Sequence, residues 1–468
     1  MAIILDHLQG LSDSKWMGIP GSVAVCVGLD IHSIPGLTQV HQKLTKNSGS
    51  TVDEFVKVRL ACSNGYSFWF SSTSGKIWAR SSAGSWSLAH TTTSTGDDFC
   101  LGAEEYNGYI YWATSTRLHR IAIADADNSW ASVSHDWATF TVGNTSWHPM
   151  AKQNLKLFIG DGNLVASVNS SGTFTANALD IKTPFQIKTM VPFDIDLLIG
   201  TWVADTVNRT EVIRWDTTSP SWNTSDPIEE VGINAFMRDD NYMYAQAGLA
   251  GNWYYYDGVQ LQPFKRIPGT YTSTSYGVVH PGATANFKGI PVFGFSNGSG
   301  NPALQGVYSM GSYSKDYPKV LDLSWPISSG SLSSIEIGAI LVLGFDLLVA
   351  WKDGSTYGVD AIDYSAKYAS AYLETRMIYP GQRDIEKVMS AAYAFYNSLP
   401  ASTAVVISYS KNAAAYVSMS AETKVNSIFQ KVQSELSVDG IGSLQLKFAF
   451  TVSSNDAPTI EAYGVDFE

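Results

Sequence analysis

Residues 107–112 read NGYIYW, a tight turn followed by a strand of aromatic and aliphatic side chains. A second apolar run, LHRI, follows at 118–121, and the pair SW stands at 129–130. Asn-Gly is a strong signal for a two-residue turn between antiparallel strands. Aromatic and β-branched residues favour strands. The stretch therefore predicts a small antiparallel sheet made of consecutive hairpins.

The same unit recurs along the chain and gives seven copies. One residue in the strand of each copy serves as a marker, and the markers are Ser67, Ile110, Leu157, Leu198, Met243, Val292 and Leu348. Successive markers lie roughly 41 to 56 residues apart, and a period of about 40–50 residues with four short strands is typical of a β-propeller blade. We predict an all-β chain with a propeller of about seven blades, six or eight remaining open. The alternative is a row of unrelated hairpins in β-sandwiches.

Three copies end on a tryptophan that follows a serine, namely Trp86, Trp130 and Trp222. A large residue repeated at one place in the unit favours true repeats over unrelated hairpins. We expect these side chains to pack between adjacent blades, where they fill a gap of fixed size. The aromatic run at 253–256 has two interpretations, which are blade core and exposed anchors for a partner.

The two ends of the chain differ from its middle. Residues 1–50 contain no blade, and a Gly/Pro-rich stretch stands at 18–21. We expect an extended assembly segment that runs along the ring or supplies a strand that closes it. Residues 51–370 form the predicted propeller. The apolar window at 335–350 is interrupted by charge and predicts two buried strands joined by a turn.

Residues 371–468 have longer strands and predict a C-terminal antiparallel β-sandwich. The segment at 443–450 alternates polar and apolar residues with period two, as a half-buried strand does. The segment at 404–410 is a second strand. Residues 383–397 are compatible with an amphipathic helix, but a strand is favoured because the segment leads directly into the turn at Leu399 and Pro400.

Composition excludes several classes of protein. The chain has 468 residues, a formal net charge of −12 and only 15% charged residues. Proteins that grip nucleic acid usually carry a basic surplus, so tight nucleic-acid binding is not expected. No secretory leader and no apolar run long enough to span a membrane is visible. Three distant cysteines predict neither a disulfide framework nor a metal site, and we expect them to be buried; they are Cys26, Cys62 and Cys100.

The motifs that carry known chemistries are missing. The eight histidines stand singly in the sequence, without metal-ligand spacing. Asp125, Asp127 and Asn128 offer oxygen ligands for calcium, but a solvated blade tip is the simpler interpretation. Residues 81–86 approach the repeated box of sialidases but lack its aspartate. We therefore expect no catalytic, cofactor-binding or metal-binding residues, no cofactor, and no enzyme activity.

The layout nevertheless resembles a known class of proteins. The element GLDIHSIPGL at 28–37 precedes the propeller, and LPASTAV at 399–405 lies in the sandwich that follows. This order resembles virion structural proteins of tailed bacteriophages, especially the tail nozzle and tail-tube proteins of podovirus-like phages. The resemblance implies a homo-oligomeric ring, typically of six copies, around the channel through which DNA leaves. It brings no catalytic residues.

The resemblance also implies partners and a location. The protein would contact other tail proteins on the adapter or portal side and tail fibres, and it would be assembled into the virion in the host cytoplasm. An acidic ring would repel phosphates, so that DNA slides without sticking. This expectation requires acidic residues on the face of the DNA channel. The alternatives are a glycan- or receptor-binding propeller and, less favoured, a sialidase-like hydrolase.

Overall fold

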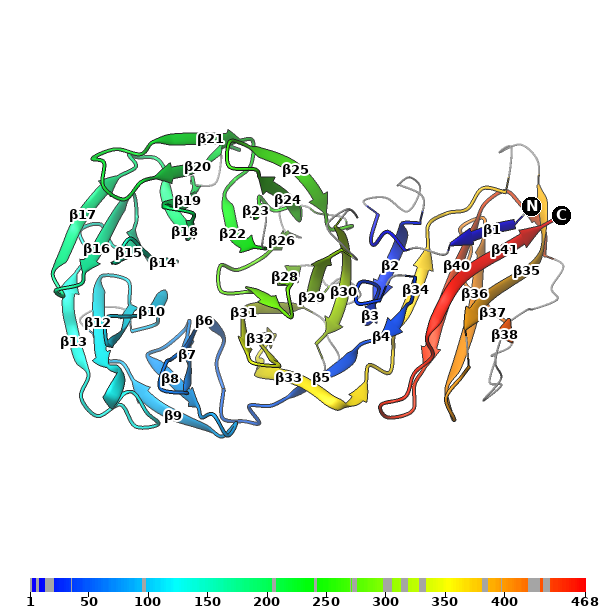
Figure 1. Cartoon of the computed structure of the whole chain (residues 1–468), viewed down its shortest axis with the longest axis horizontal. Coiled ribbons are helices and arrows are strands. Elements are labelled where there is room, and N and C mark those ends of the chain that lie inside the picture. The colour runs from blue at the N-terminus through cyan, green and yellow to red at the C-terminus, as the bar shows by residue number, and fades with distance from the viewer. Residues whose placement is uncertain are drawn as a thin grey trace.

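The computed structural model of the chain consists almost entirely of β-strands, which form a ring of small sheets beside a second β-rich unit (Figure 1). It describes residues 2–5, 8–12, 21–34, 36–94, 98–203, 208–239, 242–269, 271, 276–297, 305–312, 319–327, 334–380, 386–396, 398–419, 430–431 and 438–468. The Gly/Pro-rich stretch at 18–21 lies, except for Gly21, outside these residues.

The first three blades are consecutive four-stranded antiparallel sheets. Blade one contains β6 (Val56–Ala61), β7 (Ser67–Ser71), β8 (Lys76–Arg80) and β9 (Trp86–Thr91). Blade two contains β10 (Gly102–Tyr106), β11 (Tyr109–Ala113), β12 (Arg117–Ala122) and β13 (Ser134–Thr139), with the short 3-10 helix η1 (Ile123–Asp125) between its last two strands. Blade three contains β14 (Met150–Gln153), β15 (Lys156–Asp161), β16 (Leu164–Asn169) and β17 (Phe174–Asp180).

The next three blades repeat this arrangement. Blade four contains β18 (Gln186–Phe193), β19 (Asp196–Trp202), β20 (Thr210–Trp215) and β21 (Thr224–Ile228). Blade five contains β22 (Ile233–Arg238), β23 (Met243–Ala247), β24 (Asn252–Tyr256) and β25 (Leu261–Arg266). Blade six contains β27 (Thr284–Phe287), β28 (Ile290–Asn297), β29 (Gly306–Gly311) and β30 (Val320–Pro326), and β26 (Gly277–Val278) also pairs with β28.

Blade seven takes its outer strand from the other end of the chain. Its first three strands are β31 (Ile335–Leu343), β32 (Asp346–Asp353) and β33 (Thr356–Lys367), and the fourth is β5 (Gln42–Lys46). Leu44 of β5 pairs with Ile362 and is fully buried. Of the two roles considered for the N-terminal segment, β5 thus has the second, since it closes the ring.

The propeller prediction is confirmed, and each of the seven markers lies in the second strand of its blade. The segment at 335–350 forms the strands β31 and β32 as expected. Trp253 and Tyr256 of the aromatic run are blade core, since they are buried in β24. All three cysteines are buried and free. Within the described ranges, no helix is long and apolar enough to cross a membrane.

The second unit is a sandwich of two sheets, as predicted, and 383–397 contains a strand. One sheet has the order β1 (Ala2–Leu5), β41 (Ile460–Phe467), β35 (Lys387–Tyr396) and β38 (Gln430–Lys431), with β39 (Val438–Ile441) on β35. The other contains β2 (Val23–Val27), β34 (Tyr372–Thr375), β40 (Leu444–Thr451), β36 (Ala404–Lys411) and β37 (Val417–Ser418). The N-terminal segment therefore contributes β1 and β2 to the sandwich as well as β5 to the propeller.

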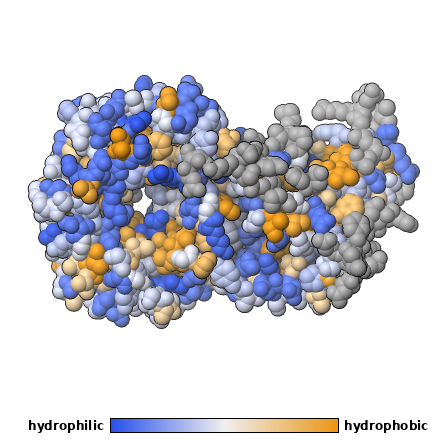
Figure 2. Space-filling view, viewed as in Figure 1, coloured by the Kyte–Doolittle hydropathy of each residue, from blue (hydrophilic) through white to orange (hydrophobic). Residues whose placement is uncertain are grey.

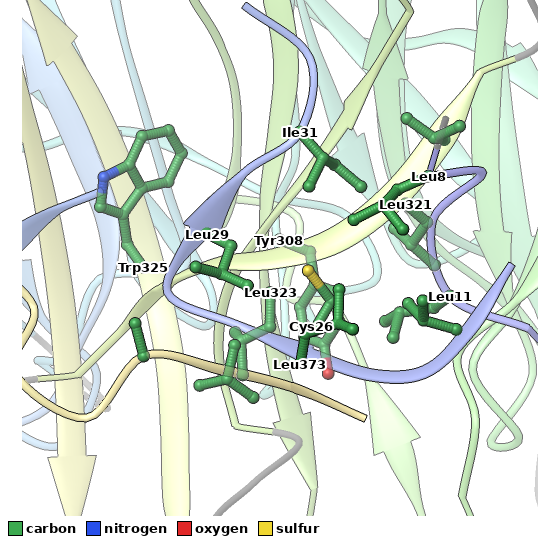
Figure 3. Packing of buried hydrophobic residues seen from close by; sticks show 14 of the residues in the cluster. Leu8, Leu11, Cys26, Leu29, Ile31, Tyr308, Leu321, Leu323, Trp325 and Leu373 are labelled. Carbon is green, nitrogen blue, oxygen red and sulfur yellow. The ribbon is translucent and has the colours of Figure 1, made fainter. Parts of the chain in front are cut away.

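One continuous sheet joins the two units. β2 pairs in parallel with β30 of blade six and antiparallel with β34 of the sandwich. The short pair β3 (Leu29–Asp30) and β4 (Gln39–Val40) follows along the same segment. Apolar side chains from the N-terminal segment pack here against Tyr308, Leu321, Leu323, Trp325 and Leu373 (Figure 3). Because these residues belong to one hydrophobic cluster, the propeller and the sandwich share a core.

A buried polar cluster attaches the 28–37 element to blade six. His32 contacts Asp322 through its Nε2 atom and lies 2.8 Å from the Ser309 hydroxyl. Ser324 donates to the other Asp322 oxygen at 2.8 Å. Burial disfavours protonation of His32, but the charge of Asp322 outweighs it and raises the pKa of the imidazole. The element is therefore held by a buried His–Asp pair inside the protein.

The repeated tryptophans pack between blades, as the sequence predicts. The Trp130 ring of blade two lies 4.9 Å from Phe68 of blade one and 5.2 Å from Trp112 of its own blade. Trp86 of blade one donates through Nε1 to Asn47, just after β5 of blade seven, at 2.9 Å. Trp222 packs on the cluster shared by blades three and four. Each tryptophan thus faces the preceding blade in the ring.

Candidate functional site

A cavity of about 500 Å³ lies in the channel of the propeller, and the space-filling view shows an opening through the ring (Figure 2). First strands of five blades contribute to its wall, namely β6, β10, β14, β18 and β22, together with the segments before β14 and before β27. Cavities of this size accommodate small molecules. The basic side chains of the wall are Lys57, Arg59, Lys188 and His280.

Lys188 of β18 is held in place by neutral groups. Its ammonium nitrogen donates to Asn234 Oδ1 at 2.5 Å and lies 4.9 Å from the centre of the Trp147 ring. Asn234 is nearly inaccessible, and its amide nitrogen donates to Gln246 at 2.8 Å and to the Gly248 carbonyl at 2.6 Å. Burial and the charge of Lys57 lower the pKa of Lys188 to about 8.

Glu336 of β31 contacts one histidine and two lysines at the edge of the cavity. Its Oε1 lies 2.7 Å from His280 Nε2 and 3.7 Å from the Lys57 nitrogen. Its Oε2 lies 2.7 Å from the Lys352 nitrogen. Burial opposes ionisation of Glu336, but the hydrogen bonds and the neighbouring cations outweigh it and hold its pKa well below the ordinary value. Burial lowers the pKa of His280, so this imidazole is neutral at pH 7.

Arg59 of β6 makes its hydrogen bonds with backbone oxygens. Its Nε donates to the Ile340 carbonyl at 2.7 Å, and its Nη2 donates to the Thr284 carbonyl at 3.3 Å. These contacts connect blade one to blades seven and six without neutralising the guanidinium charge. Lys57, Lys188 and Arg59 thus give the channel a positive charge, which the carboxylates of Glu336 and of the more distant Glu104, whose charge acts on Arg59, balance only in part.

The residues of this site form no motif in the sequence. Lys57, Lys188 and Glu336 lie far apart in the chain, and only closure of the ring brings their strands to one axis. The one local indication of the site is the presence of basic residues in the first strand of a blade, where Lys57 and Arg59 interrupt an apolar run. A sialidase-like site needs a cluster of arginines, and Arg59 is the one arginine among the residues described around this cavity.

The calcium candidates are surface residues. Asp125 and Asp127 are exposed, and one Asp127 oxygen accepts hydrogen bonds from the backbone and hydroxyl of Ser129. The carboxylate therefore stabilises a loop between the third and fourth strands of blade two. In the part of the chain that the structure describes, no group of three or more His, Cys, Asp or Glu is arranged to hold a metal ion.

A second feature is a row of apolar turns on one face of the propeller. In an antiparallel blade, the turns between strands one and two and between strands three and four lie at the same end. Leu155, Ile195 and Phe345 occupy turns of the first kind, and Val259 one of the second; they are 85%, 67%, 77% and 82% exposed. Asn154 donates to the Ile195 carbonyl at 3.0 Å, so the turns of blades three and four are in contact. We call these four residues the apolar turn face.

Three histidines that stand apart in the sequence meet between blades one and two. The ring of His135 lies 5.3 Å from that of His90 and 5.8 Å from that of His119. His119 is fully buried and accepts a hydrogen bond from the Asp136 backbone through Nδ1 at 3.1 Å. Burial lowers the pKa of His119 to about 4, although Asp136 opposes this, while His135, His90 and Arg117 add to it.

The free energy of unfolding is therefore expected to fall in mild acid. The unfolded chain takes up the His119 proton near pH 6.5 and the folded chain only near pH 4, so stability is complete above pH 6.5 and declines below it. The His119 contribution lost by pH 5 is about 2 kcal/mol. Urea unfolding at pH 7.5 and pH 5 measures this loss, which His119→Gln should reduce strongly and substitution of the exposed His135 by Gln only slightly, because burial is the main cause of the low His119 pKa. An equal loss in the wild type and His119→Gln would contradict the assignment.

Comparisons with known proteins address the fold only. No protein-family model and no curated protein matches the chain. Virginiamycin B lyase from Staphylococcus aureus, solved with quinupristin, is 10% identical over 69% of this chain and 99% of its own, with a TM-score of 0.49. The U3-55K structure is 9% identical over 68% of this chain and 97% of its own, with a TM-score of 0.46.

A third solved structure is longer than this chain. It is the extracellular domain of a hybrid two component system from B. thetaiotaomicron, 14% identical over 70% of this chain, with a TM-score of 0.48. The match spans about two fifths (41%) of that structure. All three are similarities of fold, and propellers serve many functions. No family assignment follows from them.

Proposed function

We propose that this chain is a non-enzymatic structural subunit of a tailed-bacteriophage virion, a tail nozzle or tail-tube component that forms a ring of about six copies around the DNA exit channel. The apolar turn face is the observation that supports assembly. Exposed apolar side chains scattered over a surface need no explanation. Here four of them project from turns at one end of the propeller, where a neighbouring subunit would bury them.

The shared core of the propeller and the sandwich supports the same proposal. A subunit that transmits load along a tail requires a fixed angle between its parts. The continuous sheet through β30, β2 and β34 and the common hydrophobic cluster hold that angle here. In this proposal the two ends of the subunit contact other tail proteins, on the adapter or portal side and on the fibre side.

The experiment is native mass spectrometry combined with electron microscopy of the purified chain. We expect a ring of about six copies, and a chain that stays monomeric at high concentration would contradict the proposal. The triple variant Leu155→Asp, Ile195→Asp and Phe345→Asp should shift the ring to monomer, because each carboxylate would be desolvated in the interface. These positions are exposed, so the unfolding free energy of the monomer should change by no more than about 0.5 kcal/mol per site.

The matched control is Val142→Asp. Val142 is 52% exposed and lies in the segment between β13 and β14, at the opposite end of the blades. It should leave the ring intact. Equal loss of the ring in the control and in the triple variant would assign the effect to general charge repulsion.

Because the protein is acidic, we expect the assembled ring to repel DNA phosphates, so that DNA slides through it. The DNA channel would be enclosed by several subunits and is a different space from the cationic channel inside each propeller. Titration of the purified ring with duplex DNA at physiological salt should show no retention. Tight binding, or a ring whose DNA-facing wall is lined by Lys and Arg, would contradict this part of the proposal.

The channel cavity favours one alternative, a propeller that binds glycans or a host receptor. Binding of the monomer to a glycan array would support that alternative over the ring subunit. Hydrolysis of fluorogenic sialosides would support the sialidase-like alternative, which the single arginine around the cavity disfavours.

A further inference from the structure

We propose that the channel cavity of each propeller binds the phosphate group of a small molecule, with Lys57 and Lys188 as the residues that bind its charge. This function does not depend on the ring proposed above. The residues come from blades one and four, and the cavity between them is about 500 Å³.

The charge of the wall favours an anion. His280 is neutral, and Glu336 shares its two oxygens among His280, Lys57 and Lys352. One carboxylate thus faces two lysines at the edge of the cavity, and Lys188 and Arg59 add two further positive charges. Among the described residues, neither Lys188 nor Arg59 has a carboxylate within ion-pair distance, in a protein of net charge −12. A bound anion would supply the missing negative charge.

The position of Lys188 is fixed before any ligand arrives. Both amide hydrogens of Asn234 have carbonyl acceptors in β23 and its following turn, so Asn234 must present Oδ1 to the lysine. The Trp147 ring lies against the same ammonium group. A neutral partner and an aromatic ring orient the lysine without neutralising its charge. A site whose groups are already ordered binds with a smaller entropic cost.

A phosphate monoester fits this arrangement better than a carboxylate. It carries a charge of about −1.5 to −2 at pH 7 and three acceptor oxygens. The charge of Lys57 lowers the affinity of Lys188 for protons, and a bound dianion would relieve that repulsion more fully than a single negative charge. The cavity volume of about 500 Å³ accommodates a small molecule.

The test is isothermal titration calorimetry of the intact chain at pH 7 with inorganic phosphate and with ribose 5-phosphate. We expect one site per chain with a dissociation constant below about 1 mM for at least one of them. Tighter binding of the ester would identify a phosphorylated metabolite as the ligand, and equal binding would identify free phosphate. No binding of either at 10-fold higher concentration would overturn the proposal.

Lys188→Met and Lys57→Met should each weaken binding at least tenfold. Methionine keeps much of the length and apolar contact of lysine, and loss of Lys188 removes a poorly solvated charge but leaves Asn234 Oδ1 without its donor, so circular dichroism of each variant checks that it is folded. The control is Lys182→Met. Lys182 lies four residues before the start of β18 and pairs on the surface with Asp180 at 2.9 Å. Unchanged binding in Lys188→Met, or an equal loss in Lys182→Met, would overturn the proposal.

A pH profile of the wild type needs no substitution. Because the free Lys188 loses its proton near pH 8, affinity should decrease from pH 7.5 to pH 9, and binding at pH 8.5 should take up protons from the buffer. Titrations in two buffers with different ionisation enthalpies measure that uptake. Affinity that is constant over this range would exclude Lys188 as the phosphate-binding residue. Each arm reports binding per chain in either oligomeric state, so its failure is distinct from failure of the ring proposal.

Discussion

A chain that lacks residues 1–50 is expected to lose the cooperative unfolding transition of the intact protein and to aggregate. The deletion removes β5 from blade seven and both β1 and β2 from the sandwich. It also removes a set of fully buried apolar side chains, namely Leu8, Leu11, Val23, Cys26, Val27, Leu29, Ile31, Val40 and Leu44. Each contributes about 1.5–3 kcal/mol on burial, and together they match or exceed the roughly 5–15 kcal/mol that stabilises a typical domain.

The measurement is thermal and urea unfolding followed by circular dichroism, with light scattering for aggregation. A graded version is Leu44→Ala, which should cost about 2–5 kcal/mol because it leaves a cavity at the closing strand. Lys43→Ala is its control on the same strand, since Lys43 is partly exposed and pairs on the surface with Asp363 at 3.6 Å. A shortened chain that unfolds cooperatively at the wild-type midpoint would show that closure by β5 is dispensable.

Replacement of Trp130 by alanine is expected to cost about 3–5 kcal/mol, the range for a buried aromatic side chain. Trp130 is 3% exposed and touches Phe68 of the preceding blade and Trp112 of its own. Its loss opens a cavity at the seam between blades one and two, so that hydrogen exchange should rise first in β7 and β11. Urea unfolding of Trp130→Ala measures the free energy.

Two further variants check that interpretation. Trp130→Phe fills most of the gap and removes an indole nitrogen that is buried without a partner, so it should cost less than alanine. Trp222→Ala should also cost less, because Trp222 is only partly buried at its seam. A loss below about 1 kcal/mol in Trp130→Ala would show that the seam repacks around the cavity.

The blades were predictable because their signals are local. Asn107 and Gly108 are turn residues with left-handed φ angles of 47° and 82°, and they form the hairpin that the sequence predicts. The strand after each turn is buried on both faces, as Phe68, Trp69 and Phe70 are in β7, and so it appears in the sequence as a continuous apolar run. A recurrent hairpin of this type therefore predicts the position of the second strand in each blade.

The remaining features depend on contacts between distant segments. β2 is a short apolar strand with no hairpin partner next to it in sequence, and its neighbours β30 and β34 follow some 300 residues later. The charges of the channel are separated in the same way. Lys188 lies among ordinary strand residues, and its environment exists only because β22 brings Asn234 beside it. No local pattern contains that information.

The pairing of β1 with β41 has a consequence for biosynthesis. Ala2 lies opposite Asp466, so β1 can pair only after residues up to 466 have been synthesised. The two ends of the chain lie next to each other (Figure 1). At about 5–20 residues per second, a ribosome needs tens of seconds to reach β41. Throughout that time β1 and β2 have backbone hydrogen-bonding groups without their strand partners. The propeller ring also stays open until β33 has been synthesised and can pair with β5. The sheet that contains β1 can therefore be completed only after β41 has been synthesised, and until then nascent chains at high local concentration are exposed to exchange of these strands between neighbours.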